Sequence, residues 1–293
     1  MSAAAADVRV GGRWSPGQRL KNTCIRAAVR ALLAIADALP AALLLASCRT
    51  LGLLAALLSP RLLGRAEARA RTVLPEAEAR RVARACFGNA GANLALALLM
   101  RRPGSRASDF VRLEPSDRQL LEAAGGAVVV SAHLGPFELI APAVRELGLP
   151  AVVVVRESYD PELDPHVDAH RRRHGVAVIH RGDPGAATRM LRGLRSGGLL
   201  GLLADLPARV ERAEVSLLGQ RAELPIGPAR VARAARVPLL AACLVPEERR
   251  RFRLKVVRIR LEGACDVELT QRVADALGAA ITAAPEHWLW MAG

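Results

Sequence analysis

A histidine and a glutamate five residues apart are the side chains of this sequence best suited to chemistry. His133 and Glu138 lie in the stretch "SAHLGPFELI", residues 131–140, directly after the apolar run "GGAVVV". On one continuous helix the two side chains would point about 140° apart and would not meet. We expect them to meet because His133 stays in a strand-end loop, Gly135 permits a sharp turn, and Pro136 starts a helix that carries Glu138.

The chemistry that such a pair supports is removal of a proton. A carboxylate beside an imidazole fixes the tautomer of the ring and raises its basicity, so the free ring nitrogen can deprotonate a hydroxyl. No serine stands between the two residues, so the nucleophile is expected to come from the substrate. The spacing fits equally well a surface histidine near a helix start that Glu138 merely caps.

The elements that position this pair alternate between short apolar runs and helical stretches from about residue 126 onward. The apolar runs are "GAVVVSA", "PAVVVVR", "VAVIHR", "GLLGLLAD", "VPLLAACLV" and "RFRLKVVRIRL". This order predicts an α/β fold with a largely parallel sheet flanked by helices. Ligands of such sheets bind beyond the carboxyl ends of the strands, which is where His133 lies.

The first part of the chain differs in texture from the α/β region. Residues 1–22 are small, polar and basic and are expected to form a flexible arm, whereas residues 23–60 are strongly apolar. Their longest uncharged piece, 38–48, is short of the roughly 20 residues that span a bilayer. We expect apolar helices at a membrane interface, with a tilted insertion or two ordinary core helices as alternatives. Residues 61–293 would then form the α/β domain, with a helix break at Pro75.

The charge balance is strongly basic. Forty-two Lys and Arg residues against 28 Asp and Glu give a net charge of +14, which favours nucleic acid, anionic lipid or phosphorylated substrates as partners. One Tyr, four Phe and three Trp do not supply the stacking surface of nucleic-acid modules, so an anionic membrane surface is favoured and no nucleic acid is expected. The basic run "RRRFRLKVVRIR" alternates as a half-exposed strand would, with Arg251, Arg253 and Lys255 on one side.

Rival kinds of site have weaker signals. His166, His170 and His174 share one helical face in "HVDAHRRRH", but three arginines crowd the last histidine, so we expect a solvated basic face and no metal. The sequence contains no phosphate loop and no Gly-x-Ser-x-Gly elbow, which argues against a nucleotide site and a serine hydrolase. Five widely spaced cysteines without a Cys-x-x-Cys motif favour a reducing compartment.

A set of motifs in a fixed order carries a resemblance. "HLGPFE" holds His133 and Glu138, and the block "VVVVRESYDPELDPHVDAHRRRHG" holds Arg156 and Arg171. "VIHRGD" contains Arg181, "SGGLLGLLADLPARV" contains Asp205, and "APEHWLWM" contains a Pro-Glu-x-x-x-Trp element. From about Pro40 to Met291 the chain resembles the lipid A biosynthesis acyltransferase family, the late lauroyl/myristoyl transferases, within the wider His-x4-Asp/Glu glycerolipid acyltransferase grouping.

The resemblance implies transfer of an acyl chain from an acyl carrier protein or coenzyme A thioester to a hydroxyl of a membrane lipid such as a lipid A precursor. It implies that His133 is the general base with Glu138 as its partner. Arg171 and Asp205 would complete the site, while Arg156 and Arg181 would meet phosphate. The acyl thioester would be a co-substrate, with no other cofactor, and the enzyme would work on the cytoplasmic face of the inner membrane.

Three positions depart from the family pattern. Leu206 and Pro207 follow Asp205 where the family has a polar residue, Leu218 replaces a phenylalanine, and no basic tail follows Trp290. A catalytically inactive lipid-binding or scaffold homologue on the same fold is therefore the alternative to an acyltransferase.

Overall fold

The computed structural model describes residues 14–156, 164–207, 210–247 and 251–292. Among these residues a seven-stranded sheet has the strand order β1-β9-β8-β2-β5-β3-β4. Its strands are β1 Val111–Arg112, β2 Ala127–Ser131, β3 Ala151–Val155, β4 Ala177–His180, β5 Leu199–Leu203, β8 Leu239–Pro246 and β9 Phe252–Ile259. Neighbouring strands run parallel except that β9 is antiparallel to β8. The predicted α/β fold with a largely parallel sheet is confirmed, and each of the six apolar runs forms a strand.

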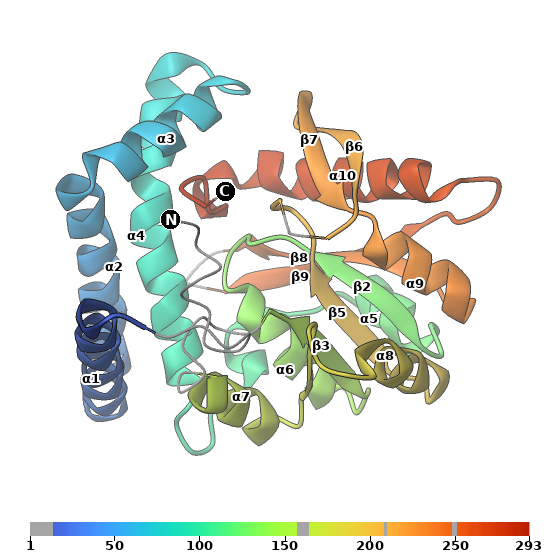
Figure 1. The fold of residues 1–293 in the computed structure, drawn as a ribbon, viewed down its shortest axis with the longest axis horizontal. Coiled ribbons are helices and arrows are strands. Elements are labelled where there is room, and N and C mark those ends of the chain that lie inside the picture. The colour runs from blue at the N-terminus through green and yellow to red at the C-terminus, as the bar shows by residue number, and fades with distance from the viewer. Residues whose placement is uncertain (1–13, 157–163, 208–209, 248–250, 293) are drawn as a thin grey trace.

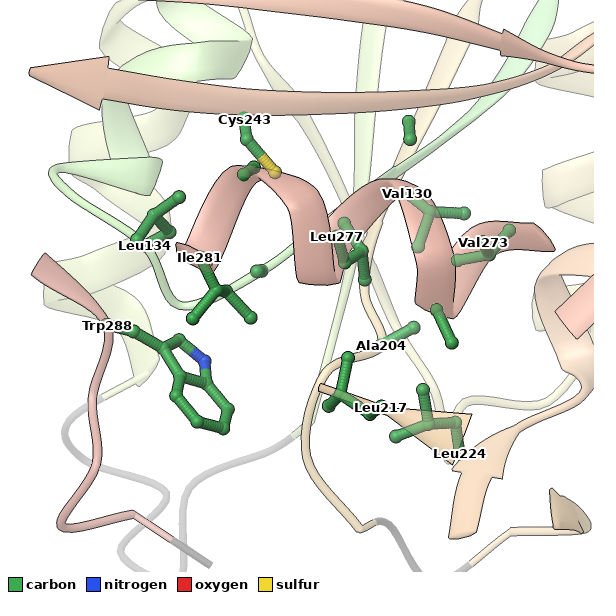
Figure 2. Close-up of a cluster of buried hydrophobic side chains, with 14 of the residues drawn as sticks. Val130, Leu134, Ala204, Leu217, Leu224, Cys243, Val273, Leu277, Ile281 and Trp288 are labelled. Atoms are coloured by element: carbon green, nitrogen blue, oxygen red, sulfur yellow. The ribbon is translucent and has the colours of Figure 1, made fainter. Parts of the chain in front are cut away.

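Both faces of the sheet are covered, which explains why the central strands are apolar at nearly every position. All five residues of β2 are buried, with Val128 and Val130 in one core and Val129 in the other. Helices α8 Ala186–Arg195, α9 Gly227–Ala235 and α10 Asp266–Ala283 contribute to the first core, and α5 Pro115–Glu122 and α6 Ile140–Glu146 contribute to the second. Figure 2 shows part of the first core, where side chains of α10 meet those of the sheet.

A second, two-stranded sheet was not predicted. Strands β6 Arg212–Leu217 and β7 Gln220–Pro225 form an antiparallel hairpin that packs against α10. The strands are joined by Leu218 and Gly219, both with positive φ angles of 55° and 73°. Hairpin turns of this kind need the left-handed region at both central residues, and Asn-Gly is their usual sequence signal. Leucine adopts this region reluctantly, so the pair Leu218-Gly219 did not stand out as a turn in the sequence.

The half-exposed strand predicted near the end of the chain is β9. Phe252, Leu254 and Val256 are buried, while Arg251 and Lys255 are exposed. Arg253 is only half exposed, because its guanidinium contacts the buried carboxylate of Asp117 at 3.2 Å. The alternation therefore holds over this part of β9.

A layer of N-terminal helices lies against one side of the α/β unit (Figure 1). It consists of α1 Pro16–Ala38, α2 Ala41–Leu58, α3 Pro60–Arg71 and α4 Glu76–Leu99. The break between α3 and α4 is at Pro75, as predicted. α1 begins at Pro16, within the segment expected to be an arm, because the Ser15 side chain caps it and proline suits the first turn; residues 1–13 of that segment lie outside the described residues.

Helices α2 and α4 pack with their backbones in contact. A Cβ atom at Gly52 would collide with the Phe87 carbonyl, and one at Gly91 would collide with the Cys48 carbonyl. The first half of α4 lies in one core and its last turns lie in the other, so this helix joins the N-terminal layer to both faces of the sheet. The layer is therefore firmly attached to the α/β unit.

Two helices within the described residues are long and apolar enough to cross a membrane, namely α2 and α4. More than half of the apolar window of α4 is buried in the protein, as in a core helix, whereas only 17% of α2 is buried. Leucines on α2 remain in contact with solvent, and Leu57 and Leu58 are 73% and 81% exposed. This exposed apolar surface weakly favours association with a membrane.

Candidate active site

The pairing of β2 with β5 brings His133 to Asp205. In these adjacent parallel strands Ser131 lies opposite Leu203, so His133 and Asp205 both stand two residues beyond the paired ends. The Nδ1 atom of His133 lies 2.8 Å from Oδ1 of Asp205. A carboxylate can only accept, so Nδ1 carries the proton and Nε2 is left as the basic nitrogen.

Asp205 is a buried carboxylate with three donors. Its side chain has no exposed surface, whereas that of His133 is 25% exposed. Oδ2 accepts the backbone N–H of His133 at 2.9 Å and the indole N–H of Trp288 at 2.7 Å. Three hydrogen bonds compensate for the burial of the charge and hold the imidazole in one orientation.

The backbone after His133 turns sharply at Gly135. This residue has a φ of 60°, and a Cβ atom there would lie 3.0 Å from the Leu244 carbonyl. The turn leads into a short 3₁₀ helix, η4 Phe137–Leu139, which carries Glu138. The predicted turn is confirmed, but Pro136 precedes the first helical residue instead of occupying it.

Glu138 is paired with Arg171 and not with His133. The Arg171 Nε and Nη2 atoms donate to the two Glu138 carboxylate oxygens at 3.2 and 2.7 Å. Among the described residues, the hydrogen bond recorded for the His133 ring is the one to Asp205. The expectation that Glu138 orients the imidazole is therefore corrected: η4 turns Glu138 toward α7 Asp164–Arg173, and the adjacent strand β5 supplies the carboxylate.

Arg171 also lies near a second carboxylate of the site, that of Asp168. Asp168, on the same helix, is 7% exposed. One of its oxygens lies 3.6 Å from Nη1 of Arg171, and the other accepts from His180 Nε2 at 2.8 Å. This cluster ties α7 to the end of β4.

The histidine face of α7 is partly buried against the end of α4, whereas a solvated face was predicted. His174 Nε2 lies 2.8 Å from the Met100 carbonyl, and the rings of His170 and His174 are 5.2 Å apart. Burial, followed by the charge of His174, lowers the pKa of His170 to about 4. α4 ends at this face, which is why the basic helix is covered there. The side chain of His166, the third histidine of the predicted face, lies outside the described part of the chain.

An apolar groove starts beside His133 and runs along the sheet. The ring of Phe137, which lines it, is 5.0 Å from the His133 ring, and the Glu138–Arg171 pair lies at the same end. The floor includes a row across three strands, Val129 of β2, Gly201 of β5 and Val153 of β3, which are in register. Because the middle residue lacks a side chain, the floor is lowest at Gly201.

Arg156 and Arg181 come together at the carboxyl ends of β3 and β4. Val155 lies opposite His180, so each arginine is the next residue along its strand, and both are exposed. The Arg181 backbone N–H donates to the Val155 carbonyl at 2.9 Å. The segment that joins Arg156 to α7, residues 157–163, lies outside the described residues.

The site includes residues that sequence reasoning did not single out. Trp288 and Asp168 contact predicted site residues directly, and Phe137 contacts the His133 ring. Trp288 stands in the quoted motif "APEHWLWM", but its spacing carries no sign of a contact with Asp205, 83 residues away. Within the residues that the structure describes, His, Cys, Asp and Glu side chains form no group of three that could hold a metal ion.

Comparison with known proteins identifies a family for nearly the whole chain. The model of a family described as bacterial lipid A biosynthesis acyltransferases matches residues 15–292. No curated protein matches the chain. The matched range contains the N-terminal helical layer, the sheet and every residue of the site described above.

Proposed function

The chain belongs to the bacterial lipid A biosynthesis acyltransferase family, and on that premise we propose that it transfers a fatty acyl chain to a lipid hydroxyl with His133 as general base. The family places the protein among the acyltransferases of lipid A and lipopolysaccharide biosynthesis. An acyltransferase of lipid A acts on a lipid acceptor with an acyl donor. The donor in our proposal is an acyl carrier protein or coenzyme A thioester, and the acceptor is a glycolipid such as a lipid A precursor.

The observation that carries the proposal is the contact between His133 and Asp205. A base needs one ring nitrogen held by a carboxylate and the other open to substrate. Nδ1 is held at 2.8 Å by a fully buried carboxylate, while the imidazole itself is partly exposed. Within the described part of the chain no hydrogen bond occupies Nε2, which is the arrangement that base catalysis requires.

The reaction then proceeds without a covalent enzyme intermediate. Nε2 of His133 takes the proton of the acceptor hydroxyl as its oxygen attacks the thioester carbonyl carbon, and a C–O bond forms. The tetrahedral intermediate collapses, the C–S bond breaks, and the imidazolium returns the proton to the departing sulfur. Asp205 stabilises the imidazolium throughout, as an orienting carboxylate does in base catalysis.

The groove beside His133 is the site that we assign to the acyl chain. Apart from Ser131, Glu138 and Arg171 its lining is apolar, which suits burial of methylene groups at about 0.8 kcal/mol each. The Glu138–Arg171 pair lines the groove and holds η4 to α7 beside it. Arg156 and Arg181, at the rim, are assigned to a phosphate of the donor or acceptor, because the planar guanidinium group binds phosphate oxygens in a fork.

The location that we propose is the cytoplasmic face of the inner membrane. The exposed leucines of α2 would lie in the lipid, and the basic residues of α1 would face anionic headgroups. Arg19, Lys21 and Arg30 of α1 fit this arrangement, since all three are exposed. Support comes from the apolar surface of the N-terminal layer.

The experiment that tests the proposal offers both donors to the full-length protein. Purified protein is mixed with labelled acyl carrier protein or labelled acyl-coenzyme A and a total membrane lipid extract, and the labelled lipid is identified by mass. We expect one class of hydroxyl-bearing glycolipid to gain the acyl mass. Folded, membrane-bound protein that transfers from neither donor would contradict the proposal and favour an inactive lipid-binding homologue.

A further inference from the structure

We propose that Trp288 and Arg69 are positioning residues for His133, so that the N-terminal helical layer forms a working part of the active site. This inference rests on the proposed function, because it assigns these residues to the same general base. Neither residue contacts the groove or the exposed side of the imidazole. Both act through Asp205: Trp288 contacts this carboxylate directly, whereas Arg69 contacts the C-terminal segment that carries Trp288.

Trp288 gives Asp205 its one side-chain donor besides the imidazole among the described residues. Its indole N–H lies 2.7 Å from Oδ2, the oxygen that does not bind the His133 ring. Trp288 is 3% exposed and lies beside Leu134 and Ile281 at the end of the buried cluster (Figure 2). A donor on a buried carboxylate takes up part of its negative charge, so the indole tempers how strongly Asp205 attracts the imidazole proton.

The backbone strengthens this connection. Leu134, the residue after His133, forms an antiparallel bridge with Trp288. The Gly135 N–H donates to the His287 carbonyl at 3.0 Å, and the Leu289 N–H donates to the His133 carbonyl at 3.2 Å. The C-terminal segment therefore pairs along the loop that carries the proposed base.

Arg69 holds this C-terminal segment from helix α3. Its Nη1 atom donates to the Trp290 carbonyl at 3.0 Å and also to the Ala292 carbonyl, and its guanidinium carbon lies 5.2 Å from the centre of the Trp288 ring. Burial and the neighbouring Arg65 lower the pKa of Arg69, whereas the Asp205 charge raises it. Trp288 thus contacts Arg69 through the face of its ring and Asp205 through its indole N–H.

Helix α4, a second helix of the layer, also contacts the C-terminal segment. The Asn89 amide on α4 donates to the Glu286 carbonyl at 2.8 Å and accepts from Arg49 of α2 at 2.8 Å. Residues of α2, α3 and α4 are therefore linked to the chain end that supplies Trp288. Figure 1 shows the C-terminus next to this helical layer. A layer that served only to hold the protein on lipid would not need these contacts.

The experiment compares Trp288→Phe with Trp290→Phe in the full-length protein. Both variants keep an aromatic ring and lose one indole hydrogen bond, but Trp290 donates to the Pro285 carbonyl and not to Asp205. We expect Trp288→Phe to lower kcat about tenfold with KM little changed, the usual effect of losing a hydrogen bond to a charged group. The acidic limb of its pH–rate profile should move to higher pH, because Asp205 then holds the imidazole proton more strongly. Trp290→Phe should leave the limb in place.

Arg69→Met tests the link to the helical layer, with the exposed Arg61→Met on the same helix as its control. We expect Arg69→Met to move the acidic limb in the same direction and to combine with Trp288→Phe less than additively, since both act through one contact. Arg61→Met should change neither the limb nor kcat. An unmoved limb in Trp288→Phe, or equal effects of the two tryptophan variants, would overturn the inference.

A readout without turnover separates this inference from the proposed function. The His133 ring signal is followed by NMR in protein with labelled histidine, assigned by its loss in His133→Gln, and titrated in wild type and Trp288→Phe. A titration that moves to higher pH supports the positioning role even if no acyl transfer is found. An unchanged titration in an enzyme that does transfer acyl chains refutes the positioning role and leaves the proposed function standing.

Discussion

Nδ1 of His133 lies 2.8 Å from Oδ1 of Asp205, although 72 residues separate them in the chain. The contact exists because β2 and β5 are neighbours in the sheet and end at the same level. Glu138, only five residues from His133, is turned away and paired with Arg171. Proximity in sequence is thus a poorer guide to the partner of the base than proximity at the carboxyl edge of the sheet.

The two carboxylates are expected to differ in their importance for activity. Asp205→Asn should lower kcat by about 10²–10⁴-fold, because an amide no longer holds the imidazole in the reactive tautomer. Glu138→Gln should cost about tenfold or less, since it weakens only the pair with Arg171. Steady-state kinetics of both variants, with unfolding temperatures as the control for folding, checks this order. A larger loss in Glu138→Gln would restore that residue as the partner of His133.

Gly201 is expected to set the depth of the acyl groove. A Cβ atom there would make ordinary contact with Val153 at 3.5 Å, so alanine fits, but valine would fill the space between Val129 and Val153. Competition among acyl donors of graded length should show a preference for shorter chains in Gly201→Val and little change in Gly201→Ala. Gly193→Ala, which adds a Cβ atom 3.5 Å from Val152, serves as the control. An unchanged chain-length preference in Gly201→Val would show that the acyl chain does not bind in this groove.

The exposed face of α2 is expected to bind lipid. Leu51, Leu54 and Leu58 are 58%, 44% and 81% exposed. Replacing all three by glutamate should release the protein from vesicles of anionic lipid in a flotation assay, because charged groups are costly to bury in hydrocarbon. Glutamate at Val257 and Val267, which are 38% and 46% exposed on the α/β unit, should leave flotation unchanged. Equal flotation of all variants would exclude α2 as the lipid-binding element.

Acidification is expected to destabilise the protein through His170. Its pKa is about 4 in the folded chain against an ordinary value of 6.5, because burial, and then the charge of His174, disfavours the proton. Between these values the unfolded chain takes up a proton that the folded chain refuses, so stability is fully present above pH 6.5 and falls toward pH 4. The loss amounts to at most about 3 kcal/mol.

His170→Phe, which keeps a ring against His174, should flatten this dependence in thermal unfolding measured from pH 7 to 4.5. Part of the dependence should survive, because burial also lowers the pKa of His287. An identical slope in wild type and variant would show that His170 does not titrate in this way.

Six of the seven strands of the large sheet were predictable because each is a short apolar run bounded by glycine, proline or charge, and β2 is buried at all five positions. His133 was predictable as a site residue because it is the first ionisable side chain after such a run. The order of the strands was not, since β5 is separated in the chain from β2 by β3 and β4 yet inserts next to it. The partner of His133 and the contact from Trp288 depend on that insertion. They therefore could not be read from spacing.

The N-terminal helices illustrate the same limit. Their existence followed from composition, but the packing of α2 on α4 through Gly52 and Gly91 depends on two surfaces that meet only in the fold. The hydrogen bond from Arg69 to the Trp290 carbonyl also depends on the fold, because it joins residues 221 positions apart.

The most direct test of the account is a single-turnover comparison of wild type with His133→Ala, using the labelled acyl donor and lipid acceptor that the wild-type enzyme accepts. Wild type should move the label from thioester to lipid, and His133→Ala, with an unchanged unfolding temperature and unchanged binding to vesicles, should transfer at least about 10²-fold more slowly. Transfer at the wild-type rate by His133→Ala would contradict the assignment of His133 as the general base.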